Sequence, residues 1–281
     1  MSTMQSSTME TAPSPPLNPL AITEDLTPLP ELKPAGDTHV QFEGQLSRPL
    51  RLHEDVRNGC GGQTWPAGML MGKHLLRYHM DTLRDARILE LGAGGGLVGL
   101  GVALELEMLG QRDNKLVITD QAEMLDLMKT NIGLNQLDES VDARILNWGE
   151  PLPEAVVTQK PNVIIAAECV YFEPAFPLLL QTLKDLLALN EDAIVFFCFK
   201  RRRRADLQFI KMAKKTFLIE ELYDEDRPVF ERQRLFLFSI RSRKAKSEAK
   251  KQPKVTKKEA AENRKIAGLD SAAALGVKVK I

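Results

Sequence analysis

The chain has 281 residues, of which 43% are hydrophobic and 27% are charged, and its 38 basic side chains balance its 38 acidic ones. This composition is typical of a globular protein in water, and no apolar stretch approaches the roughly 20 residues of a membrane-spanning helix. The first residues contain no apolar run of the signal-peptide type. The cysteines Cys60, Cys169 and Cys198 have no metal or redox spacing, and the last two lie in apolar runs typical of core thiols. We therefore expect a cytoplasmic protein without a membrane span.

Charge and aromatic content divide the chain into three parts. Residues 241–281 carry 13 Lys and Arg against 4 Asp and Glu, whereas residues 1–240 have a net charge of −9. Residues 1–36 contain no aromatic residue and hold 7 of the 16 prolines. A segment of that composition buries too little apolar surface to offset the loss of chain entropy. We predict a disordered leader at 1–36, one domain at 37–240, and a basic, disordered tail at 241–281.

Within residues 37–240, short apolar runs alternate with segments of helical periodicity. In chain order, the predicted strands are 87–91, 116–119, 143–146, 162–167, 193–199, 216–222 and 235–240. The predicted helices are 97–109, 121–134 and 176–189. Strands that alternate with helices predict an α/β fold with a doubly wound, mostly parallel sheet. The connection 223–234 is too short for a typical crossover helix, so we expect the last two strands to form a terminal antiparallel hairpin.

A glycine-rich segment, Glu90-Leu-Gly92-Ala-Gly94-Gly95-Gly96-Leu-Val-Gly99, joins the first strand to the first helix. Glycines here let the backbone turn tightly and let a ligand approach the main chain at the carboxyl edge of the sheet. Its last six residues match the dinucleotide pattern G-x-G-x-x-G. Glu90 favours another ligand, because a carboxylate repels pyrophosphate but attracts the ammonium and sulfonium groups of S-adenosylmethionine. An NAD site, an S-adenosylmethionine site and a turn without ligand all stay open.

Asp120 ends the second predicted strand, 24 residues beyond Gly96. A carboxylate at this place can accept hydrogen bonds from both ribose hydroxyls of an adenosine. This feature serves NAD and S-adenosylmethionine equally. Asp120 could instead cap the helix that follows it.

Five segments extend the pattern: Gly61-Gly-Gln-Thr-Trp65-Pro66, Glu90-Leu-Gly92-Ala-Gly94, Asp120, Asn147-Trp148-Gly149 and Ala167-Glu168-Cys-Val-Tyr171. In this order they resemble the seven-strand methyltransferases that modify protein lysines, and in particular fungal enzymes that act on translation elongation factor 1-alpha. The resemblance covers residues from about 40 to 240. The glycine motif alone is typical of many methyltransferases, and the other segments make the combination more specific.

The resemblance implies a Rossmann-like sheet of seven strands, S-adenosylmethionine as cofactor, and a role for each matching residue. The implied cofactor contacts are Trp65 closing over the cofactor, Gly92, Ala93 and Gly94 against its methionine part, Asp120 at the ribose, Trp148 beside the adenine, and Ala167 through its backbone; Glu90 joins them by its charge. Each aromatic residue has a structural alternative. Trp65 could anchor the leader, Trp148 could fill the core, and Tyr171 could cap the sheet edge.

The catalytic hypothesis concerns Glu168 and Tyr171. Methyl transfer is an in-line displacement, so positioning of donor and acceptor supplies most of the catalysis. The acceptor lysine must be neutral, although its ordinary pKa is near 10.4. Glu168 and Tyr171 would orient the amine, and Glu168 or a water would receive its proton. The family usually has Asp at the position of Glu168, and the extra methylene displaces the charge.

The remaining polar residues give weaker signals. The four histidines are scattered, so they indicate no metal site, and His74 and His79 are expected at the surface of a helix. The run Lys200–Arg204 is expected at the carboxyl edge of the sheet, where it could contact an acidic partner surface. No aromatic residues interleave with these arginines, which disfavours nucleic acid as the partner.

Taken together, the residues and the resemblance predict a monomeric, S-adenosylmethionine-dependent protein-lysine N-methyltransferase. Its expected partner is a protein substrate, translation elongation factor 1-alpha. An NAD-type oxidoreductase that uses the same glycine loop is one alternative. A non-catalytic binding module of the same fold is the other.

Overall fold

The computed structural model of the protein describes residues 34–110 and 115–243. The predicted leader and tail therefore lie outside the described residues, except for 34–36 and 241–243. The first strand of the described part begins at Gly36 and the last ends at Ser242. Within the described ranges, no helix combines the length and the apolar character needed to cross a bilayer.

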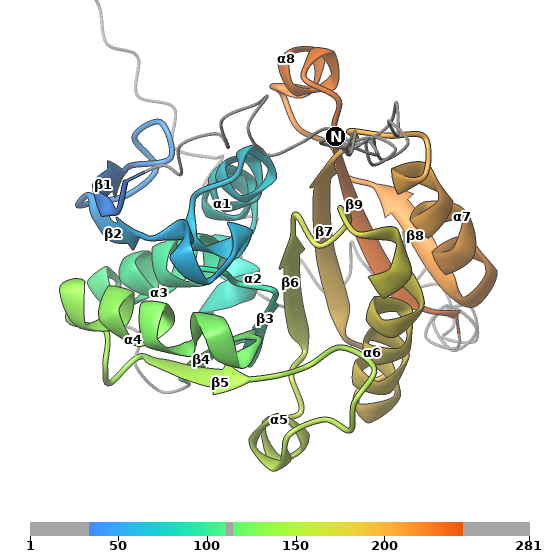
Figure 1. Cartoon of the computed structure of the whole chain (residues 1–281), viewed down its shortest axis with the longest axis horizontal. Helices are drawn as coiled ribbons and strands as arrows, with labels where there is room; N and C mark the ends of the chain where they lie inside the picture. Colours follow the sequence, from blue (N-terminus) through green and yellow to red (C-terminus); the bar gives the residue numbers. More distant parts are fainter. Residues whose placement is uncertain (1–33, 111–114, 244–281) are drawn as a thin grey trace, which may run out of the picture. The chain divides into compact units, whose positions relative to one another are not determined.

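Seven strands form one sheet in the order β5-β4-β3-β6-β7-β9-β8, as Figure 1 shows. The strands are β3 (Ile88–Leu91), β4 (Leu116–Asp120), β5 (Val141–Ile145), β6 (Val163–Ala167), β7 (Ile194–Lys200), β8 (Phe217–Glu221) and β9 (Leu235–Ser242). Strands β3 to β7 pair in parallel, whereas β9 pairs antiparallel with both β7 and β8. The prediction of a doubly wound, mostly parallel sheet with a terminal antiparallel hairpin is confirmed.

Helices cover both faces of the sheet, because its central strands are apolar on both sides. One apolar cluster joins the sheet to α1 (Pro66–Tyr78), α2 (Met80–Arg84), α3 (Leu97–Met108), α4 (Leu125–Leu134) and α8 (Arg227–Arg232). A second cluster joins the opposite face to α5 (Glu154–Gln159), α6 (Phe176–Leu189) and α7 (Asp206–Thr216). Helices α3, α4 and α6 were expected from the sequence with bounds, and α1 only as a helical stretch that contains His74. Helix α8 lies in the connection between β8 and β9, which is long enough for a short helix but not for a crossover.

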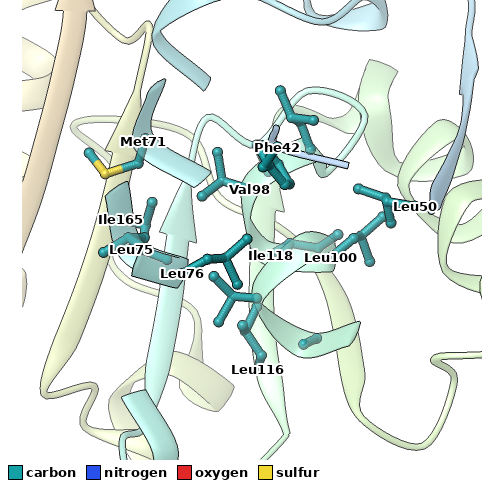
Figure 2. Close-up of a cluster of buried hydrophobic side chains, with 14 of the residues drawn as sticks. Phe42, Leu50, Met71, Leu75, Leu76, Val98, Leu100, Leu116, Ile118 and Ile165 are labelled. Atoms are coloured by element: carbon teal, nitrogen blue, oxygen red, sulfur yellow. The ribbon is translucent and has the colours of Figure 1, made fainter. Parts of the chain in front are cut away.

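A two-stranded antiparallel sheet, β1 (Gly36–Val40) with β2 (Leu50–Glu54), precedes α1. Its connection carries Phe42, which is fully buried against α1 and α3 among the side chains of Figure 2. A Cβ atom on Gly72 would lie 2.2 Å from the Phe42 ring, and one on Gly101 would lie 2.5 Å from it. Two helices thus leave space for one aromatic ring, which anchors the N-terminal hairpin to the sheet.

Two buried asparagines, Asn131 in α4 and Asn135 at its C-cap, continue this attachment. The side-chain amide of Asn135 exchanges hydrogen bonds with the backbone of Arg51, and that of Asn131 does so with His53. Asn131 Nδ2 also donates to the carbonyl oxygen of Gly95 at 2.8 Å. The asparagines therefore pair with β2 as a neighbouring strand would, and they tie β2 to the glycine-rich loop.

Candidate functional site

A cavity of about 1020 Å³ lies at the carboxyl ends of β3, β4 and β6, where parallel sheets bind their ligands. Its volume suits a large organic cofactor together with the end of a substrate side chain. All ten residues that the sequence singled out line its wall: Trp65, Glu90, Gly92, Ala93, Gly94, Asp120, Trp148, Ala167, Glu168 and Tyr171. The fold thus brings together residues from five separate segments of the chain.

The glycine-rich loop forms the floor of this cavity and has no room for side chains. Gly92 and Gly94 have φ angles of 61° and 56°, in the left-handed region that favours glycine. A Cβ atom on Gly94 would lie 2.3 Å from the carbonyl oxygen of Gly61, and one on Gly92 would lie 3.1 Å from the Trp148 ring. The loop therefore exposes its backbone between Trp148 and the segment before α1, as a cofactor cradle requires.

Glu90 is buried beneath the loop at the start of α3. Its Oε2 atom accepts a hydrogen bond from the backbone N–H of Gly99 at 2.8 Å, and a Cβ atom on Gly99 would come within 2.5 Å of that oxygen. Burial raises the pKa of Glu90 to about 8, although the amides of Gly99 and Val98 act in the opposite direction. The carboxyl group accepts hydrogen bonds from backbone amides at the N-terminus of α3, and a pyrophosphate would need the same amides. This geometry argues against the dinucleotide alternative.

Asp120 joins the end of β4 to the glycine-rich loop. Its Oδ2 atom accepts from the backbone N–H of Gly94, and its Oδ1 atom accepts from that of Gln121, both at 2.7 Å. Burial raises the pKa of Asp120, while the Gly94 amide lowers it. The short 3-10 helix that follows, Ala122–Met124, has no side-chain cap, so Asp120 does not serve as its cap. Each carboxylate oxygen keeps a lone pair with which to accept a ribose hydroxyl.

Three aromatic residues stand around the cavity. Trp65 immediately precedes α1, and its indole Nε1 donates to the carbonyl oxygen of Cys60 at 2.8 Å. Trp148 is half-buried and packs against the second apolar cluster as well as the cavity, so it is also part of the core. Tyr171 is about half exposed, and partial burial raises the pKa of its hydroxyl to about 12. Tyr171 therefore stays protonated at neutral pH and cannot act as the base.

Glu168 follows β6 and is the most constrained residue of the cavity. Its φ angle is 60°, and such a left-handed conformation costs a residue with a side chain roughly 1–2 kcal/mol. Oε1 accepts from the backbone N–H of Ala67 at 3.0 Å, in the first turn of α1. Oε2 accepts from Arg202 Nη1 at 2.9 Å and from the backbone N–H of Lys200 at 3.4 Å. The buried carboxylate is thus already an ion-pair partner.

Arg202 is a cavity residue that sequence reasoning did not assign to the site. Its guanidinium pairs with Glu168 and also lies over the Trp65 ring, 5.1 Å from the ring centroid. The sequence did single out the run Lys200–Arg204, which begins at the last residue of β7, at the expected edge of the sheet. Since β7 is the neighbour of β6, a basic residue after β7 can reach an acidic residue after β6. That adjacency is the signal that could have found the pair.

The predicted surface position of His74 and His79 is wrong. His74 is 1% exposed, and its Nδ1 atom lies 2.7 Å from an Asp224 carboxylate oxygen, while its Nε2 atom lies 3.1 Å from Nε2 of His79. Burial lowers the pKa of both rings, that of His79 to about 4. Helix α1 packs on the sheet, so its His74 position faces inward. Neither histidine lines the cavity.

Metal ligands and thiols are further groups that could act at the cavity, which Cys60 and Cys169 help to line. Among the residues that the structure describes, no group of three His, Cys, Asp or Glu side chains is arranged to hold a metal ion. Cys169 and Cys198 are buried free thiols, as expected from the apolar runs around them, and Cys60 is exposed.

Comparison with known proteins identifies the family to which this site is similar. A family model described as "Lysine methyltransferase" matches residues 45–216, which include every residue that lines the cavity. "Protein-lysine N-methyltransferase EFM6" of Saccharomyces cerevisiae is 37% identical over 206 residues, which cover 67% of this chain and 84% of that protein. "Protein N-lysine methyltransferase METTL21A" of Danio rerio is 31% identical over 206 residues, which cover 72% of this chain and 89% of that protein.

Proposed function

We propose, from the premise that this chain belongs to the lysine methyltransferase family, that its substrate is a lysine of translation elongation factor 1-alpha. The chain is an S-adenosylmethionine-dependent protein-lysine methyltransferase, and the identity of the protein substrate is the finer step. The observation that carries the proposal is the convergence of ten residues, from five segments, on one cavity. The choice of elongation factor 1-alpha as the target is supported by the resemblance of those segments to fungal enzymes that act on it.

The cavity residues fit the cofactor by shape and charge. We assign the methionine part to the backbone of Gly92, Ala93 and Gly94, since a Cβ atom on either glycine would crowd its neighbours. We assign the ribose to Asp120 and the adenine to Trp148. Trp65 would close over the bound cofactor. Ala167 would contribute backbone at the end of β6. Glu90 would contribute negative charge from below, because a cation in the cavity favours its ionised form.

When bound, S-adenosylmethionine supplies a methyl group attached to a positively charged sulfur. The role of the protein is to hold the acceptor nitrogen in line with the bond between methyl group and sulfur, and to exclude competing water. The lysine amine must lose its proton before it can attack, because a protonated nitrogen has no lone pair. Glu168 already accepts from Arg202 and Ala67, so we propose that it orients the amine and that water takes the proton.

A folded protein is the substrate that best suits the mouth of this cavity. Tyr171, Phe172 and Leu178 line it and are each about half exposed. Aromatic and large apolar side chains are enriched where proteins bind one another. This supports a macromolecular acceptor rather than a free amino acid.

The experiment is methylation of purified, unmodified elongation factor 1-alpha with S-adenosylmethionine, followed by peptide mass spectrometry. We expect methyl groups on a lysine with wild-type enzyme, and none when S-adenosylmethionine is omitted. A labelled protein other than this factor, in an extract of cells that lack the enzyme, would refute the proposed target while leaving the enzyme class intact.

A further inference from the structure

The pair of Glu168 and Arg202 places opposite charges at the point of the cavity assigned to the acceptor amine. The Glu168 side chain is 8% exposed, and that of Arg202 is 33% exposed. Both line the cavity, together with Trp65. The amine would therefore arrive at a carboxylate that is already neutralised.

We propose that Arg202 is a positioning residue that prevents Glu168 from holding the substrate lysine as its ammonium ion. The proposal rests on the proposed lysine methylation and adds the device that favours the neutral amine. Arg202 donates a hydrogen bond to Oε2 of Glu168, so that this oxygen is already bonded when the lysine arrives. The charge of Arg202 also repels a second cation.

The need for such a device follows from charge. At pH 7.4 the ammonium form of a lysine exceeds the neutral amine by roughly 1000-fold, since its ordinary pKa is near 10.4. A buried carboxylate without a partner would attract that ammonium and raise its pKa, which would retain the proton that must leave. A fixed cation beside the carboxylate has the opposite effect, because it disfavours a second positive charge.

Arg202 is held where it can act in this way. Its guanidinium stacks over Trp65 and donates to both Glu168 and the carbonyl oxygen of Lys200, the latter at 3.3 Å. Glu168 is fixed from the other side by the N–H of Ala67. A guanidinium suits this place because it is planar, bonds along its edge while it stacks on its face, and does not lose its proton.

The thiols and the tyrosine near the pair keep their charge state across the neutral range, and Glu90 titrates alike in every protein compared. Burial raises the pKa of the thiols of Cys169 and Cys198 well above their ordinary value, and it raises the pKa of Tyr171 to about 12. The pKa of Glu90, about 8, is common to the wild-type protein and to every variant below, so its titration cancels in their comparison. A difference in pH dependence between variants therefore reports on the amine.

The first test needs no protein substrate. Butylamine is titrated at about pH 7 into enzyme that holds S-adenosylhomocysteine, and the fluorescence of the two tryptophans reports binding. We expect Arg202→Gln to bind butylammonium roughly tenfold more tightly than wild type, a difference of about 1.4 kcal/mol. Arg202→Lys and the control Arg84→Gln, an exposed arginine of α2, should match wild type. Adding Glu168→Gln to Arg202→Gln should remove the gain. Equal binding by folded wild type and Arg202→Gln would overturn the proposal.

The second test uses the protein that the wild-type enzyme methylates. We expect Arg202→Gln to lower both KM and kcat at about pH 7, and to shift the rise of kcat with pH to a higher apparent pKa than in wild type, because the bound amine keeps its proton longer. A purely structural role for Arg202 would lower kcat by the same factor at every pH and leave that apparent pKa unchanged, which would also overturn the proposal. If wild type methylates no protein at all, the proposed function fails, and the butylamine titration still decides the role of Arg202.

Discussion

Glu90 shows at the scale of one residue how the cofactor cavity affects stability. Its carboxyl group is buried beneath the glycine-rich loop, and its pKa of about 8 exceeds the ordinary value of 4.5. Between these two values the unfolded chain releases a proton that the folded chain retains. Folded stability from this group is therefore complete below about pH 4.5 and is lost as the pH rises to about 8.

Glu90→Gln tests this linkage, because glutamine resembles the protonated acid. At about pH 8.5 we expect the free energy of unfolding of the variant to exceed that of wild type by on the order of 4 kcal/mol, so that the variant unfolds at higher urea concentration. At about pH 4.5 the two proteins should differ little. Urea titrations of both proteins at the two pH values make the measurement. Parallel pH dependence of wild type and variant would show that Glu90 is not the group responsible.

Asp120 is the residue on which adenosine recognition depends most in this account. Asp120→Asn keeps the size of the side chain and removes its charge, so we expect affinity for S-adenosylhomocysteine to fall by about 1–3 kcal/mol without unfolding. Titration calorimetry measures the loss, with the exposed Asp126→Asn of α4 as the matched control. Unchanged affinity in a folded Asp120→Asn protein would remove Asp120 from the site.

Single residues also mark the limit of prediction from sequence. Glu90, Asp120 and Glu168 could be placed at one edge because each lies at or next to the carboxyl end of a parallel strand, and such ends meet there. The adjacency of β6 and β7 indicates a basic partner for Glu168, but which of the five basic residues Lys200–Arg204 forms the ion pair is known only from the structure. The burial of His74 was also missed, because Asp224, its partner, comes from a connection 150 residues away.

At the scale of elements, one buried ring and two side-chain amides are prominent among the contacts that hold the N-terminal hairpin. Phe42 fills the space above Gly72 and Gly101, and Asn131 links β2 to the loop that lines the cavity. The hairpin thus supports the wall that Leu52 to Glu54 contribute to the site. Its attachment couples the stability of the fold to the shape of the cavity.

Phe42→Ala should destabilise the protein by about 3–5 kcal/mol, because it removes a fully buried ring and leaves a cavity between two helices. Urea unfolding at neutral pH measures this loss. Phe172→Ala is the matched control, since its ring is 56% exposed, and it should cost far less. Similar losses in the two variants would contradict the anchoring role of Phe42.

Elements were predictable where a periodic apolar pattern was strong. Helix α6 has the predicted bounds, whereas β5 begins at Val141, two residues before its prediction, because it follows the register of β4. The hairpin β1–β2 was missed because its strands are short and half exposed. Helix α7 was missed because it begins at Asp206, shortly after the basic run Lys200–Arg204, whose pattern indicates a loop.

At the scale of the whole molecule, both apolar clusters are built from residues between Val40 and Ile240. We therefore expect a truncated chain of residues 37–244 to keep a single cooperative melting transition close to that of the full chain. Differential scanning calorimetry of both proteins makes the comparison. Aggregation or loss of the transition in the truncated chain would show that the domain boundaries are wrong.

The central claim is that this cavity transfers methyl groups from S-adenosylmethionine to a protein lysine. The most direct measurement incubates the enzyme with methyl-labelled S-adenosylmethionine and an extract of cells that lack it, then locates the label by peptide mass spectrometry. We predict label on lysine of a protein with the wild-type enzyme and with Asp126→Asn, and a sharp reduction with Asp120→Asn at limiting cofactor. Label on no protein, on residues other than lysine, or at the same level with Asp120→Asn would contradict the account.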